Sequence, residues 1–131
     1  MDLPWSAAGT PPAGQDAFVM ASRFELTSIW RSPAFLTQAV RAWQQARRSP
    51  GVYGVTLRAE LRRRTYWTLS AWTDEAALRE FARTEPHRSI VRRVRPWAET
   101  ATFRFWTVPG DRLTPGQLWP EAQRRIADPE Q

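Results

Sequence analysis

The fold is decided by the stretch Thr65-Tyr-Trp-Thr-Leu-Ser-Ala-Trp72, which is followed directly by Thr73-Asp-Glu-Ala-Ala-Leu-Arg-Glu-Phe81. β-Branched and aromatic residues in the first part predict a strand. Asp74 is a typical N-cap for the short amphipathic helix that the second part predicts. One face of the strand mixes aromatic and polar side chains, namely Tyr66, Thr68, Ser70 and Trp72. Such a face is typical of a cavity wall rather than of a dry core.

The segments on either side complete a regular pattern. Ser32-Pro33 is a helix start with proline at the first helical position, and Pro50-Gly51 ends that helix. The expected elements are a strand at 18–26, a helix at 32–48, strands at 52–61 and 65–72 joined by a tip at 62–64, a helix at 74–94 interrupted near Pro86, a strand at 99–108 and a helix at 115–126.

This order, β-α-β-β-α-β with one more C-terminal helix, predicts an α+β protein of the ferredoxin-like class. Its four-stranded antiparallel sheet carries helices on one face. We expect a flexible N-terminal arm at 1–17, because Pro, Ala, Gly and Ser dominate it without periodicity. The globular domain is expected at 18–108 and a C-terminal extension with a short helix at 109–131.

Composition narrows the classes of function. The chain has 131 residues, enough for one domain with one core. It has no cysteine, which excludes thiolate metal sites and thiol nucleophiles, and its single histidine, His87, argues against a metal site. We expect no signal peptide, because the N-terminal residues include neither a basic region nor an apolar run, and no segment approaches the ~18 apolar residues of a membrane span. We therefore expect a cytoplasmic protein with no membrane partner.

The charge is strongly basic. Net charge is +6, and all 19 basic residues are arginines. This usage is most simply explained by the base composition of the genome, although guanidinium groups also bind carboxylates, phenolates and phosphates well.

Alternation along the strands predicts two unlike sheet faces. One is apolar and is expected to pack on the helices; it includes Phe24, Leu57, Trp67, Leu69 and Phe103. The other is expected to gather Arg23, Glu25, Thr56, Arg58, Glu60, Tyr66, Ser70, Trp72, Arg104 and Trp106. Large aromatic side chains among charges favour an interface or pocket over a solvated sheet with Arg–Glu pairs, which is the simpler alternative. A homodimer in which two such faces enclose a chamber would bury them.

Three stretches resemble the antibiotic biosynthesis monooxygenase family of the dimeric α/β-barrel superfamily: Phe18-Val-Met-Ala-Ser-Arg23, Tyr66-Trp-Thr-Leu-Ser-Ala-Trp72, and Leu78-Arg-Glu-Phe81 with Pro86-His87. The resemblance spans roughly 18–108. It implies a dimer, a site between the sheet and the helices of each protomer, and oxygenation of aromatic polyketides or quinols without metal or flavin. Haem ligation is not implied, because the ligating histidine of haem-degrading members would fall near Val91.

On this basis the candidate catalytic residues are His87, Tyr66 and Arg23. His87 or Tyr66 would accept a proton from a phenol or hydroquinone, and Arg23, with Arg58 and Arg104, would stabilise the resulting anion. Trp72 and Trp106 would stack on a small aromatic or anionic substrate, and Ser70 and Thr56 complete the expected binding wall. Each residue also has a structural alternative: packing near a helix start for His87, pairing with Glu25 and Glu60 for the arginines, and core filling for Trp72 and Tyr66.

Two other functions remain open from the residues alone, and a third is disfavoured. An isomerase, cyclase or dehydratase on the same scaffold would use the same groups without oxygen. A non-catalytic ligand-binding or stress protein would use the pocket only to bind. An RNA-recognition module has the same element order, but its third strand should contain glycine, which Arg64-Thr-Tyr-Trp-Thr-Leu-Ser-Ala lacks, so no nucleic-acid partner is expected.

Overall fold

The computed structural model describes residues 2–128. The elements are β1 (Ser6–Ala7), β2 (Asp16–Leu26), α1 (Ser32–Ala46), β3 (Val52–Glu60), β4 (Thr65–Trp72), α2 (Glu75–Arg83), α3 (His87–Val94), β5 (Ala98–Pro109) and α4 (Pro115–Ala127). Short 3-10 turns lie at Ile29–Arg31, Leu61–Arg63, Arg95–Trp97 and Gly110–Arg112.

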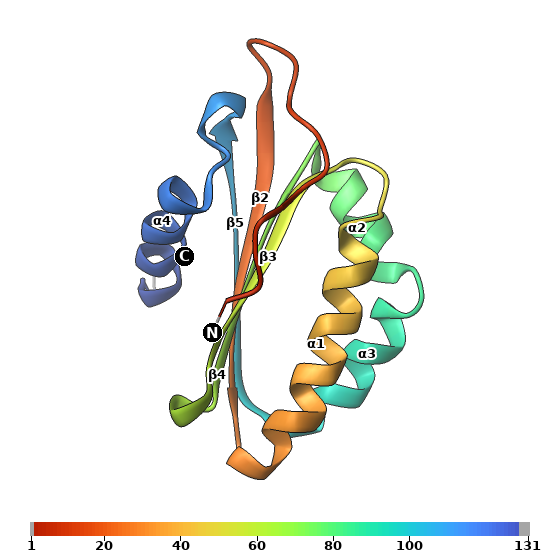
Figure 1. Cartoon of the computed structure of the whole chain (residues 1–131), viewed down its shortest axis with the longest axis vertical. Coiled ribbons are helices and arrows are strands. Elements are labelled where there is room, and N and C mark those ends of the chain that lie inside the picture. The colour runs from red at the N-terminus through yellow and green to blue at the C-terminus, as the bar shows by residue number, and fades with distance from the viewer. Residues whose placement is uncertain (1, 129–131) are drawn as a thin grey trace.

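The strands form one antiparallel sheet in the order β1-β3-β4-β2-β5. Without β1 this is the order of the ferredoxin-like fold, with β4 and β2 in the centre, so the predicted fold class is confirmed. The sheet of the single chain is open and does not close into a barrel (Figure 1). The dimeric barrel therefore stays a prediction.

The fifth strand comes from the N-terminal segment, where the sequence indicated only a flexible arm. The amide of Leu3 donates to the carbonyl oxygen of Leu57 at 2.8 Å, and that of Ala8 donates to the carbonyl oxygen of Tyr53 at 2.9 Å. The Trp5 indole lies over Gly54, where any side chain would collide with the ring. Backbone pairing needs no side-chain periodicity, which is why the alternation rule missed this strand. Met1 and residues 129–131 of the predicted terminal segments lie outside the described residues.

The two helices after β4 begin and end as the sequence predicts. The Asp74 carboxylate accepts a hydrogen bond from the amide of Ala77 at 2.9 Å and caps α2. α2 ends at Arg83, and a second helix, α3, begins at His87, directly after Pro86. The break places His87 at the first turn of a new helix rather than in the middle of a long one.

The sheet separates two layers of helices. α1, α2 and α3 cover one face, and α4 lies on the other (Figure 1). We call these the α1–α3 face and the α4 face. Four α4 side chains are buried on the second face, Leu118, Trp119, Ala122 and Ile126, in a cluster that also includes Val19, Trp67 and Leu69.

The predicted face assignment was wrong for β4. Tyr66 is paired with Phe24 of β2 and Ala59 of β3, and all three belong to the cluster on the α1–α3 face. Tyr66, Thr68, Ser70 and Trp72 therefore face α1–α3, whereas Trp67, Leu69 and Ala71 face α4. Because α4 covers the second face, the middle of the sheet is apolar on both sides. Hydropathy alone could not decide which side chains of β4 point to which face.

The α4 face is the one that the sequence analysis expected to meet a second protomer. In this chain α4 packs on it, so the sheet there is covered by the chain's own residues. Among residues 2–128, no helix has both the length and the apolar character to cross a membrane.

Candidate functional site

A cavity of about 110 Å³ lies between the sheet and α1–α3. The sheet contributes Met20, Ser22 and Phe24 from β2, Val55, Thr56 and Leu57 from β3, Thr68 and Ser70 from β4, and Phe103 from β5. The helices contribute Phe35, Ala39, Ala42, Trp43 and Ala46 from α1, Phe81 from α2, and His87, Ile90, Val91 and Val94 from α3. The surface of the cavity is almost entirely apolar. A hydrophobic molecule fits such a site better than a highly charged one.

The cavity reaches the surface between α3 and β5. Two of its lining residues are exposed there, Val91 at 36% and Phe103 at 46%. Phe24 supports the Phe103 ring edge-on at 5.5 Å between ring centroids. The mouth is thus lined by apolar side chains.

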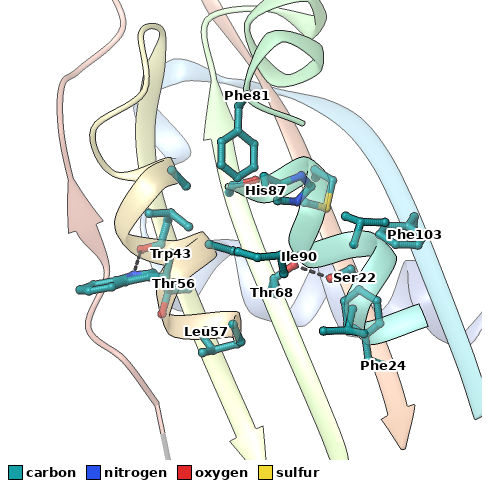
Figure 2. Close-up of a pocket in the computed structure, with 18 of the residues that line it drawn as sticks. Ser22, Phe24, Trp43, Thr56, Leu57, Thr68, Phe81, His87, Ile90 and Phe103 are labelled. Atoms are coloured by element: carbon teal, nitrogen blue, oxygen red, sulfur yellow. Dashed lines mark hydrogen bonds between the residues drawn. The ribbon is translucent and has the colours of Figure 1, made fainter. Parts of the chain in front are cut away.

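The few polar groups of the cavity come from the strands. The hydroxyls of Ser22 and Thr68 are hydrogen-bonded to one another across β2 and β4 (Figure 2). The Ser70 hydroxyl accepts a hydrogen bond from the indole nitrogen of Trp72 at 2.8 Å. One proton of the Ser22–Thr68 pair and the proton of Ser70 remain available to a ligand. The sheet therefore provides hydroxyl donors in an apolar cavity.

His87 is the only ionisable side chain that lines the cavity among the described residues. Its Nδ1 lies 2.9 Å from the carbonyl oxygen of Ala82, and its ring packs on Phe81 at 4.5 Å between centroids. A carbonyl only accepts, so Nδ1 carries the proton and Nε2 has the free lone pair. Burial lowers the pKa of His87, and the Ala82 contact opposes this only in part. The neutral imidazole, a competent base, is thus favoured near neutral pH.

Gln45 of α1 holds the backbone around His87. Its side-chain oxygen accepts from the amide of His87 at 2.7 Å. Its side-chain nitrogen donates to the carbonyl oxygens of Phe81 and Thr84 at 3.3 and 3.1 Å. One amide thus joins the end of α2 to the start of α3 and positions the histidine.

The lowered pKa can be measured directly, since the untagged protein has one histidine. We expect the His87 ring proton to titrate by NMR below the ordinary value of about 6.5. The unfolded chain then binds the proton more tightly than the folded one, so stability falls as pH drops from about 6.5 towards the lowered pKa. His87→Asn should remove this part of the pH dependence in urea unfolding. A midpoint at or above 6.5 would contradict the burial of the ring.

Four of the predicted site residues do not line the cavity, because they lie on the α4 face of the sheet: Arg23, Arg58, Arg104 and Trp106. The strands β2, β3 and β5 present them on the side opposite to Phe24, Leu57 and Phe103. Arg58 pairs with Asp2 at 3.2 Å and lies 4.4 Å from the centre of the Trp119 ring, and Arg23 pairs with Glu25 at 3.5 Å. The cavity thus joins His87 and Ser70 but none of the predicted arginines.

Arg104 and Trp106 hold α4 in place. The Arg104 guanidinium donates to the carbonyl oxygens of Arg125 and Asp128 at 3.0 Å each, which caps the C-terminus of α4. The guanidinium of Arg125 lies 5.1 Å from the centre of the Trp106 ring. These contacts give the two residues a structural role within the single chain.

Three further predicted site residues present no free polar group to the cavity. Tyr66 is fully buried, packs on Phe35 and donates to the carbonyl oxygen of Ser32 at 3.4 Å. Trp72 is buried behind Ser70. Thr56 lines the cavity, but its hydroxyl donates to the carbonyl oxygen of Leu3 at 2.5 Å on the opposite face.

Ser22, Thr68 and Trp43 line the cavity but were not predicted to be site residues from the sequence. Ser22 interrupts the otherwise apolar series Phe18, Met20, Phe24 on its strand face. A small polar residue at a core position was the available signal. Trp43 of α1 also lines the cavity, and its indole nitrogen donates to the carbonyl oxygen of Val55 at 3.4 Å.

Within residues 2–128, no three His, Cys, Asp or Glu side chains are grouped as a metal site would require. The cavity itself presents one imidazole, three hydroxyls and an apolar wall.

No family model and no curated protein sequence matches the chain. Solved structures do resemble it. SnoaB, a cofactor-independent oxygenase from Streptomyces nogalater, is 21% identical, with a TM-score of 0.59 over 71% of this chain and 93% of that one. A crystal structure named antibiotic biosynthesis monooxygenase is 14% identical, with a TM-score of 0.63 over 68% and 95% of the two chains.

A conserved protein from Methanosarcina mazei Go1 is also similar, at 13% identity and a TM-score of 0.63 over 69% of this chain and 90% of that one. Each of the three structures is matched over at least 90% of its own length, and about 30% of this chain lies outside each match. At these identities the similarity concerns the fold. The chain thus has the ferredoxin-like fold that structures of antibiotic biosynthesis monooxygenase-like proteins share.

Proposed function

We propose that this protein is a monooxygenase that oxidises an aromatic polyketide-like or quinol-like substrate with dioxygen, without metal or flavin. The observation that supports this most is the position of His87. Its ring is the single ionisable group at an otherwise apolar cavity, and Nε2 is the nitrogen left for proton transfer. The likeness of the fold to a cofactor-independent oxygenase points in the same direction.

The first step would be proton transfer from a phenol or hydroquinone to Nε2 of His87. The lowered pKa keeps the imidazole neutral and ready to accept at neutral pH. The anion that forms would be stabilised by the imidazolium and by hydroxyl donors from Ser22, Thr68 and Ser70. In this account hydroxyls replace the arginines that the sequence analysis proposed for the same task.

The electron-rich anion would then reduce dioxygen itself. For a substrate whose ring CH₂ becomes C=O, one oxygen atom enters the product and the other leaves as water, so SH₂ + O₂ gives SO + H₂O. The four electrons that dioxygen accepts all come from the substrate. The apolar wall excludes water from the anion, which favours reaction with dioxygen.

The proposal is tested by assaying a panel of anthrone- and hydroquinone-type compounds, with and without oxygen, against the uncatalysed oxidation. We expect oxygen-dependent turnover, and mass spectrometry with labelled dioxygen should find one labelled oxygen in the product. Equal turnover without oxygen would instead indicate an isomerase, cyclase or dehydratase. Binding without turnover under either condition would indicate a non-catalytic ligand-binding protein.

A further inference from the structure

Three segments that are far apart in the chain meet at the end of the molecule where α1 begins. They are the turn at 27–31, the β3–β4 tip at 61–64 and the turn at 95–97, seen at the lower end of the view (Figure 1). The amide of Leu26 donates to the carbonyl oxygen of Arg64 at 2.9 Å, and that of Thr27 donates to the carbonyl oxygen of Trp97 at 3.0 Å. The three segments therefore form one surface.

Large apolar side chains project from this surface. Trp30 is 88% exposed, the highest value among the large hydrophobic residues described, and Ile29 and Leu61 are 48% and 45% exposed. The turn that presents Ile29 and Trp30 is ordered, because the Ser28 hydroxyl accepts from the amide of Trp30 at 3.2 Å. Trp30 is therefore held outward with little packing in the described chain, and about half of Ile29 and of Leu61 is open to solvent beside it.

The same three segments carry five arginines, Arg31, Arg62, Arg63, Arg64 and Arg95. One carboxylate pair is formed here among the described residues, between Arg63 and Glu60 at 3.5 Å, while Glu60 also accepts from the Trp67 indole. The remaining nearby carboxylates are Glu25, which is paired with Arg23, and Glu99. The surface is therefore both positive and apolar.

We propose that this surface, which we call the Trp30 end, binds to anionic membranes. Trp30, Ile29 and Leu61 would enter the headgroup layer, where tryptophan is most favourable, and the arginines would meet lipid phosphates. This peripheral contact needs no spanning segment, and the sequence analysis did not foresee it because its residues lie on three separate segments. The inference does not depend on the proposed reaction.

Other partners fit the Trp30 end less well. Single-stranded nucleic acid would match the arginines and stack on Trp30, but the aliphatic side chains of Ile29 and Leu61 offer it no stacking surface. A protein partner would need apolar groups that form a flat, central patch with a polar rim. Here the apolar groups project from two short turns, which suits the deformable surface of a bilayer.

The test is flotation of the full, untagged protein with phosphatidylcholine vesicles, with and without phosphatidylglycerol. We expect binding only to the anionic vesicles, weakening as salt increases. Trp30→Ala should lower the partition coefficient at least about tenfold, because the indole supplies most of the inserted area. Arg62→Glu should lower it roughly fivefold or more, since each arginine near an anionic surface contributes about this factor.

Two variants outside the surface serve as controls. Arg112→Glu makes the same charge change at the opposite end of the molecule, and Phe105→Ala removes another exposed aromatic ring. Both should bind vesicles like the parent protein. The proposal is overturned if the parent protein does not float with anionic vesicles, or if Arg112→Glu weakens binding as much as Arg62→Glu does. It is also overturned if Trp30→Ala converts a dimer into a monomer, which would indicate a protein interface, or if single-stranded RNA binds and displaces the protein from the vesicles.

Discussion

Replacement of His87 by asparagine should lower kcat/KM for a hydroquinone substrate about 100-fold or more, the usual contribution of a positioned general base. The asparagine amide can still donate to the carbonyl oxygen of Ala82, so the start of α3 should keep its shape. What is lost is the lone pair at Nε2. The measurement is oxygen uptake with purified protein, corrected for the uncatalysed oxidation of the same compound.

The pH profile separates loss of a base from general damage. For the parent protein, kcat/KM should rise with pH through the lowered pKa of His87 and then level off, because only the neutral imidazole accepts a proton. The asparagine variant should lose this limb. Arg88→Gln, a change at the next residue of the same helix, should leave rate and profile unchanged. Parent-like activity in His87→Asn would exclude His87 as the base.

Substitution of Trp119 by alanine should destabilise the protein by about 3–5 kcal/mol, as is usual when a large buried aromatic side chain is removed. Trp119 is buried between α4 and the sheet, and its ring lies 4.4 Å from the Arg58 guanidinium. The change therefore leaves a cavity and also removes a cation–π contact. Urea unfolding followed by circular dichroism gives the difference in free energy.

Trp30→Ala is the matched control for this experiment. It removes the same side chain from a position that is 88% exposed, so its effect on stability should stay within about 0.5 kcal/mol. If Trp119→Ala were equally mild, α4 would not be a packed part of the domain. The α4 face would then be free for a second protomer, as the sequence analysis expected.

Local signals predicted the elements well. Proline at 33, the Asp74 cap and the strand from Thr65 to Trp72 each define a boundary by backbone chemistry, and the structure has the boundaries there within a few residues. The order of elements then leaves few arrangements of the sheet. For this reason the ferredoxin-like fold could be predicted without a homologue.

The site could be predicted only in part. His87 was identified because it is the single histidine and lies in the Pro86-His87 stretch that carries the family resemblance, and Ser70 because it shares a mixed face with Trp72. The side chains of β4 were assigned to the wrong face because α4 makes both sides of β4 apolar, so alternation could not tell that Tyr66 and Thr68 lie on the face opposite to Arg58. That choice depends on strand register and on a helix distant in sequence, neither of which a local pattern contains.

The proposed reaction requires that substrate binds between the sheet and α1–α3, not on the α4 face. The sharpest test is the binding of an unreactive quinone analogue, followed through the NMR signal of His87. Ala42→Phe, which fills the cavity from α1, should weaken binding at least about tenfold, whereas Arg58→Gln on the other face should leave it unchanged. Unchanged binding in Ala42→Phe together with lost binding in Arg58→Gln would show that the substrate site lies on the α4 face and not in the cavity.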